Sequence, residues 1–307
     1  MLEQLETPIA GEAPSVSMDD HLKLLREHAE LKLMYDRLKE SKRNMRQTFR
    51  YYGSKWVLAE WIISHFSPHY LYLEPFFGTG GVFFSKPPSS VEVISDLNGD
   101  IVRFFKVLRE HPDDLIRAIV LTPYAEGEYQ SAYEMDESDD IECARRFYVQ
   151  LKMSWNSGGE RGSFRRNNSV YRKPTATTEF SIIDHLYSIA NRLKCAQIDQ
   201  SDAISQIKRY DNPKALMYVD PPYVQSTRSE TRYALDMTDA GHEALAECLQ
   251  SVKGMVVLSG YDSPLYQKLF PGWKMERISA RTIDTSIRTE CLWLNPAASR
   301  QSQKRLF

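Results

Sequence analysis

The stretch YLYLEPFFGTGGVFF, residues 70–84, predicts a strand, a glycine-rich turn and a helix in direct succession. Gly78, Gly80 and Gly81 permit positive φ angles in this turn and let the backbone approach a ligand closely. The turn has neither the GxGxxG spacing of a dinucleotide site nor the GK(S/T) ending of a triphosphate-binding loop, so both of those ligands are disfavoured. A tight turn of this kind can also serve packing alone. The glycines by themselves therefore do not identify a ligand, and other motifs in the chain are needed.

The same succession of strands and helices continues along the chain. We expect residues 101–120 to be helical, strands at VEVISDL (91–97), ALMYVDPP (215–222) and GMVVLSGYD (254–262), and a hairpin at residues 273–295. This alternation predicts an α/β fold with an open, mostly parallel sheet and helices on both faces. Ligands of such sheets bind at the carboxyl ends of the strands, so the turns after residues 76, 95 and 219 are expected to share one crevice.

The strand expected at 215–219 runs into the tetrapeptide DPPY. Pro221 and Pro222 have no N–H to donate to a sheet, so the strand must end at Asp220. A carboxylate is therefore expected at the tip of a buried strand, with Tyr223 close beside it. Alone, the tetrapeptide could be a strand-terminating turn with a solvated acid; the motifs that accompany it favour a functional corner.

Two further segments place polar or aromatic residues next to predicted elements. Asp96 ends the second strand, where a carboxylate can accept hydrogen bonds from ribose hydroxyls or simply cap the next helix. In RYYGSK (50–55), Lys55 can meet a carboxylate, and Tyr51 or Tyr52 can stack on a purine. Together with the glycine-rich turn, these residues predict an adenosine-like ligand that has no pyrophosphate.

The charge of the chain is concentrated in two neighbouring segments. The net charge is −2, but Glu126–Glu142 holds eight acidic and no basic residues, and Arg145–Lys173 holds eight basic residues and one acid. The basic segment interleaves arginines with Trp155, Phe164 and several asparagines. A charge run is most often a solvated face, but a basic segment of this composition in a nearly neutral chain indicates a local contact with a polyanion.

The composition is that of a globular protein from a reducing compartment. Of the 307 residues, 42% are hydrophobic and 26% charged. The four cysteines are isolated and show no CxxC spacing, which argues against a zinc site or a disulfide framework. The sequence shows no signal peptide and no apolar run long enough to span a bilayer, so we expect a cytoplasmic protein without a membrane contact.

The N-terminal part of the chain differs from the rest. Residues 1–17 are polar and are expected to be disordered. In the helix expected after them, Leu24, Leu31 and Leu38 recur every seven residues. Two heptads are too short to establish a coiled coil, so this helix could form a homodimer or pack on its own catalytic domain.

Taken in order, the motifs resemble those of the Dam-like (alpha-group) DNA adenine-N6 methyltransferases. RYYGSK resembles the first S-adenosylmethionine segment of that family, LEPFFGTGGVFF its glycine-rich motif, ISDLN its acidic motif and DPPY its catalytic motif. SGYD and TECLWLN resemble its late strands, and the basic segment lies where the alpha group places its target-recognition region. The resemblance covers residues 45–295; Tyr51 in place of Trp and Ser54 in place of Gly depart from the family pattern.

The resemblance implies a Rossmann-like methyltransferase fold with an antiparallel last strand. It divides the chain into an N-terminal extension (1–44), a catalytic domain (45–125 and 196–300) and a target-recognition insertion (126–195). The implied protein is a bacterial or phage enzyme of restriction-modification or epigenetic marking. It would bind double-stranded DNA, use S-adenosylmethionine without a metal, and release S-adenosylhomocysteine.

The resemblance also implies how the DPPY corner works. The Asp220 carboxylate and the Pro221 carbonyl would accept hydrogen bonds from the two amino hydrogens of an adenine and aim its lone pair at the methyl group. Tyr223 would stack on this adenine after its extrusion from the duplex, which is required because a stacked base is out of reach. The gain in rate would come from orientation and electrostatic preorganisation.

Three sets of site residues follow from the resemblance. The catalytic set is Asp220, Pro221, Pro222 and Tyr223. The cofactor-binding set is Tyr51, Gly53, Lys55, Glu74, Pro75, Phe76, Phe77, Gly78, Thr79, Gly80, Gly81, Asp96, Leu97, Asn98, Asp202 and Asp220. The DNA-binding set is Asn156, Arg161, Arg165, Arg166, Tyr171, Arg172 and Lys173, with the hairpin turn Arg281–Arg288 as a second candidate.

Other functions stay open at this point. The acceptor could be cytosine N4 in DNA or an adenine in RNA, although Asp220 favours adenine N6, since cytosine-N4 enzymes more often have Ser there and RNA enzymes Asn. A cytosine-C5 enzyme would need a Pro-Cys pair, which the sequence lacks. The chain could also be an inactive DNA-binding regulator of the same fold; the intact DPPY corner and glycine-rich turn count against this.

Overall fold

The computed structural model describes residues 45–49, 51, 53–134, 139–155, 162–166, 175–223, 237–281 and 287–303. The expected N-terminal extension and its dimerising helix, residues 1–44, lie outside this part of the chain. In the part that is described, no helix is long and apolar enough to cross a membrane.

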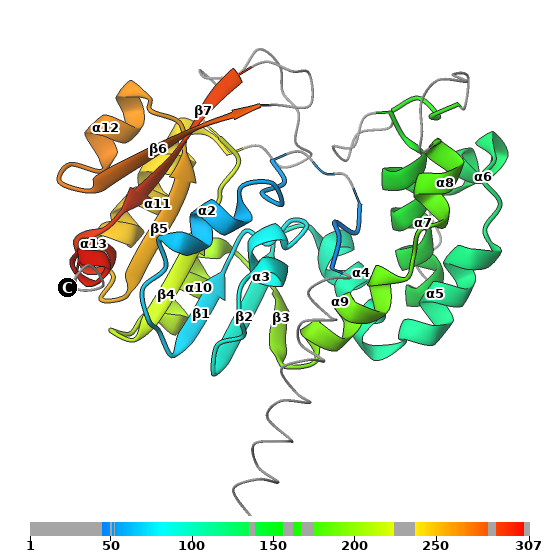
Figure 1. Cartoon of the computed structure of the whole chain (residues 1–307), viewed down its shortest axis with the longest axis horizontal. Helices are drawn as coiled ribbons and strands as arrows, with labels where there is room; N and C mark the ends of the chain where they lie inside the picture. Colours follow the sequence, from blue (N-terminus) through cyan, green and yellow to red (C-terminus); the bar gives the residue numbers. More distant parts are fainter. Residues whose placement is uncertain are drawn as a thin grey trace, which may run out of the picture. The chain divides into compact units, whose positions relative to one another are not determined.

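One seven-stranded sheet forms the centre of the fold (Figure 1), in the order β3-β2-β1-β4-β5-β7-β6. Its strands are β1 (Leu71–Glu74), β2 (Val91–Asp96), β3 (Ala196–Gln200), β4 (Ala215–Val219), β5 (Met255–Gly260), β6 (Lys274–Arg281) and β7 (Ile287–Leu294). The first five strands pair in parallel, and β7 runs antiparallel between β5 and β6. The predicted α/β class, the mostly parallel sheet and the antiparallel end of that sheet are confirmed.

Helices cover both faces of the sheet because the central strands are apolar on both sides. All five residues of β4 are buried, as expected for a parallel strand between two helical layers. Leu71 and Leu73 of β1 face one hydrophobic cluster, which includes residues of α10, α11 and α12. Tyr72 faces the other cluster, which includes residues of α2, α3, α4, α9 and α13. The bounds are α2 (Ala59–Ser64), α3 (Gly81–Ser85), α4 (Gly99–Glu110), α9 (His185–Leu193), α10 (Ala203–Tyr210), α11 (Asp239–Ser251), α12 (Pro264–Leu269) and α13 (Pro296–Gln303).

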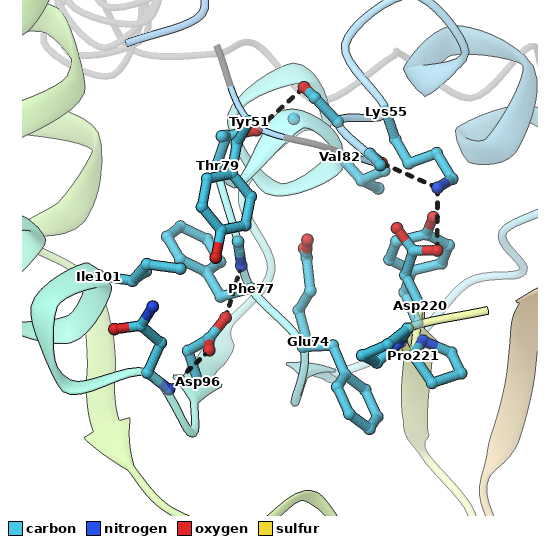
Figure 2. Close-up of a pocket in the computed structure, with 18 residues that line it drawn as sticks. Tyr51, Lys55, Glu74, Phe77, Thr79, Val82, Asp96, Ile101, Asp220 and Pro221 are labelled. Atoms are coloured by element: carbon cyan, nitrogen blue, oxygen red, sulfur yellow. Dashed lines mark hydrogen bonds and ion pairs between the residues drawn. The ribbon is translucent and has the colours of Figure 1, made fainter. Parts of the chain in front are cut away.

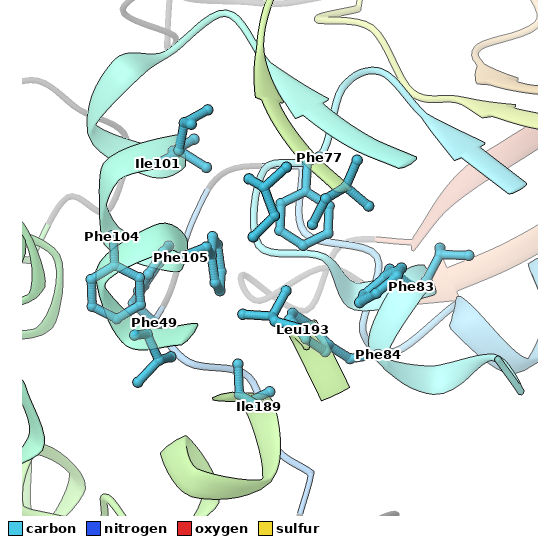
Figure 3. Close-up of a cluster of buried hydrophobic side chains, with 14 of the residues drawn as sticks. Phe49, Phe77, Phe83, Phe84, Ile101, Phe104, Phe105, Ile189 and Leu193 are labelled. Carbon is cyan, nitrogen blue, oxygen red and sulfur yellow. The ribbon is translucent and has the colours of Figure 1, made fainter. Parts of the chain in front are cut away.

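Aromatic rings fix the glycine-rich turn to helices α3 and α4 (Figure 3). Phe77 packs edge to face against Phe83 of α3, with ring centroids 5.7 Å apart, and against Phe105 of α4 at 5.0 Å. These rings are at most 4% exposed. The turn is therefore part of the hydrophobic core, although one side of it faces a cavity.

The segment between β2 and β3 forms a layer of helices on this core. It contains α4, α5 (Pro112–Leu121), α6 (Glu126–Ser131), α7 (Asp140–Met153), α8 (Ala176–Ser181) and α9. Phe104 of α4 stacks on Tyr148 of α7, with ring centroids 6.2 Å apart, and Phe147 of α7 contacts Phe49. The hydrophobic core is thus continuous into residues 126–195, and the boundary of a separate recognition domain there stays a prediction.

The segment expected to be helical at 101–120 is confirmed, and it is divided into two helices, because α4 ends at Glu110 and α5 begins at Pro112. A proline has no N–H for the preceding turn, so it begins a helix more easily than it continues one. The strand β3 was not expected from the sequence. It is an edge strand in which Ala196 and Ile198 are buried while Gln197 is exposed.

Candidate active site

The carboxyl ends of β1, β2 and β4 open into one cavity (Figure 2). The order of the sheet reverses between β1 and β4, and ligands of parallel sheets bind at such a switch point. The empty volume of the cavity is about 740 Å³, including the space at its open mouth. It is lined by Tyr51, Gly53, Ser54, Lys55, Glu74, Phe76, Phe77, Gly78, Thr79, Gly81, Val82, Asp96, Asn98, Ile101, Tyr218, Asp220, Pro221 and Pro222.

The three glycines of the turn have different tasks. Gly78 has a φ of +50°, and an added Cβ would meet no described atom within 4 Å, so its backbone is open to the cavity. At Gly80, where φ is +66°, an added Cβ would lie 2.4 Å from Cζ of Phe77. At Gly81 it would lie 2.8 Å from the backbone nitrogen of Trp56. Gly78 therefore gives a ligand access, whereas Gly80 and Gly81 are needed for packing.

Asp96 joins the end of β2 to the glycine-rich turn. Its carboxylate accepts hydrogen bonds from the backbone N–H groups of Gly78, at 2.8 Å, and Asn98, at 2.9 Å. Burial nevertheless raises the pKa of Asp96, because it outweighs these hydrogen bonds. The alternative expectation that Asp96 caps the next helix is wrong, since the N-cap of α4 is Asn98, which accepts from Asp100 N.

Glu74, at the end of β1, is a buried carboxyl group in the wall of the cavity. It is 2% exposed, and Tyr72 donates a hydrogen bond to its Oε2 at 2.6 Å. Burial raises the pKa of Glu74 to about 8, and the charge of Asp220 acts in the same direction. The hydrogen bond from Tyr72 and the charge of Lys86 lower it by less. Glu74 therefore carries a proton at neutral pH.

Lys55 connects the first motif to the DPPY corner. Its Nζ lies 3.0 Å from Oδ1 of Asp220 and donates a hydrogen bond to the carbonyl of Gly53 at 2.8 Å. The same nitrogen lies 4.8 Å from the ring centroid of Tyr223, a cation–π distance. The lysine was expected to meet a carboxylate, and in the structure this carboxylate is that of Asp220.

Most, but not all, of the predicted cofactor and catalytic residues line the cavity. Pro75, Gly80, Leu97, Asp202 and Tyr223 are not part of its lining. Leu97 is exposed, and Asp202 instead caps α10 by accepting from Ser205 N. The structure adds lining residues that the sequence analysis missed: Ser54, Val82, Ile101 and Tyr218. Ser54 binds Thr79 through a hydroxyl contact of 3.0 Å, which no local pattern in the sequence signals.

The structure describes two of the predicted DNA-binding residues, and their surroundings differ. Arg165 is 5% exposed, and its Nη1 donates a hydrogen bond to Glu179 at 2.5 Å. The Arg165 side chain thus faces inward and braces this segment against Glu179, and a contact of Arg165 with DNA stays a prediction. Arg166 is exposed and forms an ion pair with Glu126. The other predicted contacts lie outside the described residues: Asn156, Arg161, Tyr171, Arg172 and Lys173.

Fold and site together define the class of protein. A parallel sheet with an antiparallel β7, a glycine-rich turn after β1, an acid at the end of β2 and DPPY after β4 are the features of a Rossmann-like methyltransferase. Residues 51–283 match the family model of the D12 class N6 adenine-specific DNA methyltransferases, and the chain belongs to this family.

Curated relatives agree with this family. The chain is 25% identical over 275 residues to a Type II methyltransferase of Lactococcus lactis subsp. cremoris, covering 79% of this chain and 90% of the relative. It is 24% identical over 251 residues to the DNA adenine methylase of Escherichia coli (strain K12), covering 77% and 88%. A Type II methyltransferase of Methanocaldococcus jannaschii is 24% identical over 237 residues, covering 68% and 80%.

Proposed function

We propose that the cavity is where this enzyme brings S-adenosylmethionine and an adenine extruded from double-stranded DNA together for transfer of the methyl group to N6. The observation that carries the proposal is the position of Asp220, the glycine-rich turn and Asp96 around a single cavity. Direct transfer needs both reactants in one space and in a fixed orientation. The walls of the cavity supply separate groups for each.

The residues at the ends of β1 and β2 fit S-adenosylmethionine. The open backbone at Gly78 admits a nucleoside, and the Asp96 carboxylate can accept hydrogen bonds from ribose hydroxyls. Glu74 provides a carboxyl group that can face a positive charge. When bound, S-adenosylmethionine would supply a methyl group on a positively charged sulfur, which is already an activated leaving group.

The end of β4 would hold the adenine. N6 of adenine is a weak nucleophile because its lone pair is delocalised into the ring. The Asp220 carboxylate and the Pro221 carbonyl would accept one amino hydrogen each, which aims the lone pair across the cavity. Tyr223 would supply a face on which the extruded base stacks. The gain in rate would come from orientation and from fixed acceptors that need no rearrangement during transfer.

The basic segment would hold the DNA duplex. Arg166 is exposed and lies in this segment, where it could exchange its ion pair with Glu126 for one with a phosphate. The remaining DNA contacts are proposed for the predicted residues outside the described structure, Asn156, Arg161, Tyr171, Arg172 and Lys173.

A nucleoside digest tests the proposal. The protein is incubated with S-adenosylmethionine and unmethylated DNA of mixed sequence, and the nucleosides are identified by mass spectrometry, with Asp220→Ala in parallel. We expect N6-methyldeoxyadenosine from the wild type and a fall of at least about a thousandfold in the variant, while donor binding persists. Methylation by Asp220→Ala at the wild-type rate would remove the corner from the mechanism. Methylated nucleosides found only on cytosine or only in RNA would overturn the proposal that the acceptor is adenine N6 in DNA.

A further inference from the structure

Two sequence motifs, SGYD and TECLWLN, meet beside the DPPY corner. The last registered pair of the antiparallel β5–β7 ladder is Gly260 with Cys291. The next positions along this ladder are Tyr261 and Glu290, and the side chains of both contact Tyr223. Strand β7 therefore brings a second carboxylate, that of Glu290, to the DPPY corner, where it meets Tyr223.

Glu290 accepts a hydrogen bond from the hydroxyl of Tyr223, with 2.8 Å between Oη and Oε2. The edge of one ring meets the face of the other where Tyr261 and Tyr223 touch, with centroids 4.5 Å apart and planes at 70°. Burial, Asp220 and Glu290 all raise the pKa of Tyr223 well above its usual value. The phenol therefore keeps its proton and acts as the donor to Glu290.

The segment that carries Tyr223 is not held by a sheet ladder. Pro221 and Pro222 cannot donate to a ladder, and residues 221–223 belong to no strand. Glu290, in contrast, lies inside the β6–β7 ladder, where it pairs with Ile278. The hydrogen bond between Glu290 and Tyr223 therefore ties the end of this ring to the ladder.

We propose that Glu290 is a positioning residue, which holds the ring of Tyr223 in the place required for the extruded adenine to stack beside Asp220. This inference rests on the proposed function of the corner. The hydroxyl lies on the axis about which the ring turns, so its hydrogen bond to Glu290 fixes where that axis points, and the contact with Tyr261 fixes the tilt of the ring plane. Without the hydrogen bond the ring axis moves more widely, and the base spends less time with its N6 at Asp220.

A double-mutant cycle tests this inference. We expect Tyr223→Phe and Glu290→Ala each to lower kcat about tenfold, the effect of losing one charge-assisted hydrogen bond. The double variant should lose the same factor of about ten rather than about a hundred, because both changes remove one interaction. Glu290→Gln keeps an acceptor oxygen and should recover most of kcat. The Kd for S-adenosylmethionine, measured by calorimetry, should stay unchanged throughout.

A matched control separates the fall in kcat caused by losing the Tyr223–Glu290 hydrogen bond from the effect of removing any buried tyrosine hydroxyl. Tyr266 of α12 also has a buried hydroxyl with a hydrogen-bonding contact, 3.2 Å from Nδ1 of His242, but it belongs to the hydrophobic cluster of α10, α11 and α12 and does not line the cavity. Tyr266→Phe should leave kcat unchanged.

The inference is overturned by wild-type kcat in Glu290→Ala or Tyr223→Phe, or by additive losses in the double variant. If Glu290→Ala does not fold, Tyr223→Phe alone decides, since wild-type kcat in that variant leaves the hydroxyl without a role. Asp220→Ala separates this outcome from failure of the proposed function. If Asp220→Ala is active, the corner is not the site; if it is inactive while the Glu290 variants are normal, only the inference fails.

Discussion

The two walls of the cavity are built in different ways. The donor wall, Glu74–Gly81 with Asp96–Asn98, is fixed by backbone hydrogen bonds to Asp96 and by glycines pressed against aromatic rings. The acceptor wall belongs to the segment Asp220–Tyr223, of which Asp220, Pro221 and Pro222 line the cavity. This segment is fixed by side chains from far along the sequence, chiefly Lys55 and Glu290. Prolines contribute to this difference, because Pro221 and Pro222 have no N–H groups through which a backbone hydrogen bond could hold the segment.

The two walls should therefore respond differently to substitutions. On the donor wall, a change of backbone geometry disturbs both the core and the ligand, since Phe77 packs under the same turn that faces the cavity. On the acceptor wall, single side chains can be removed while the sheet beneath them stays intact.

The largest effect is expected from the glycines of the donor wall. Gly80→Ala places a Cβ 2.4 Å from Phe77 at a φ of +66°. We expect the free energy of unfolding to fall by about 3 kcal/mol, from the left-handed backbone and the overpacked ring together. Urea denaturation measures this change. A variant as stable as the wild type would show that the turn is not part of the core.

Gly78→Ala is the matched control for this prediction. It also has a positive φ of +50°, but its Cβ would meet no described atom within 4 Å. The free energy of unfolding should fall by only about 1 kcal/mol, the cost of the backbone conformation. Because the added methyl group enters the cavity, the Kd for S-adenosylmethionine should rise in this variant even though the fold is kept.

A smaller effect is expected on the acceptor wall, from Lys55→Met. The side chains of Lys55 and Asp220 are 8% and 16% exposed, so the change leaves a largely buried carboxylate without its cation. We expect the free energy of unfolding to fall by about 2 kcal/mol. In the double variant with Asp220→Asn, part of this loss should return, because no charge is then left unpaired. Equal losses in the single and double variants would contradict a direct ion pair.

The same contrast explains how much the sequence could predict. The donor wall is a continuous motif, so the strand, the turn and Asp96 were all identified from local patterns. The direction of Lys55 toward Asp220 and the approach of Glu290 to Tyr223 depend on how distant strands meet. Local sequence patterns contain no information about contacts between residues so far apart in the chain.

Exposure was equally hard to predict from composition. Arg165 and Arg166 are neighbours in a basic run, yet one is buried against Glu179 and the other is exposed. The backbone of Arg165 donates to the carbonyl of Met153, which turns its side chain inward. A charge count treats both residues alike, because it contains no information about which side chain points into the protein and which points to solvent.

The smallest effect is expected from the protonation of Glu74, in the donor wall. Its pKa of about 8 means that the carboxyl group becomes charged as the pH rises from 6.5 to 9. A positively charged donor binds an ionised carboxylate better than a neutral acid. We therefore expect the Kd for S-adenosylmethionine to fall about tenfold over this range, as the charge develops in a buried site. Calorimetry at several pH values measures it.

Glu74→Gln is the control, because it keeps the shape of the side chain and cannot ionise. Its Kd should lack the part of the pH dependence that Glu74 contributes. As the pH rises, the affinity of the wild type for S-adenosylmethionine should increase, whereas its stability against unfolding should decrease. Between pH 4.5 and about 8, the folded chain holds a proton that the unfolded chain has released, so the contribution of Glu74 to the free energy of unfolding falls as the pH rises. If Glu74→Gln and the wild type show the same pH dependence of Kd, the carboxyl group does not face the charge of the donor.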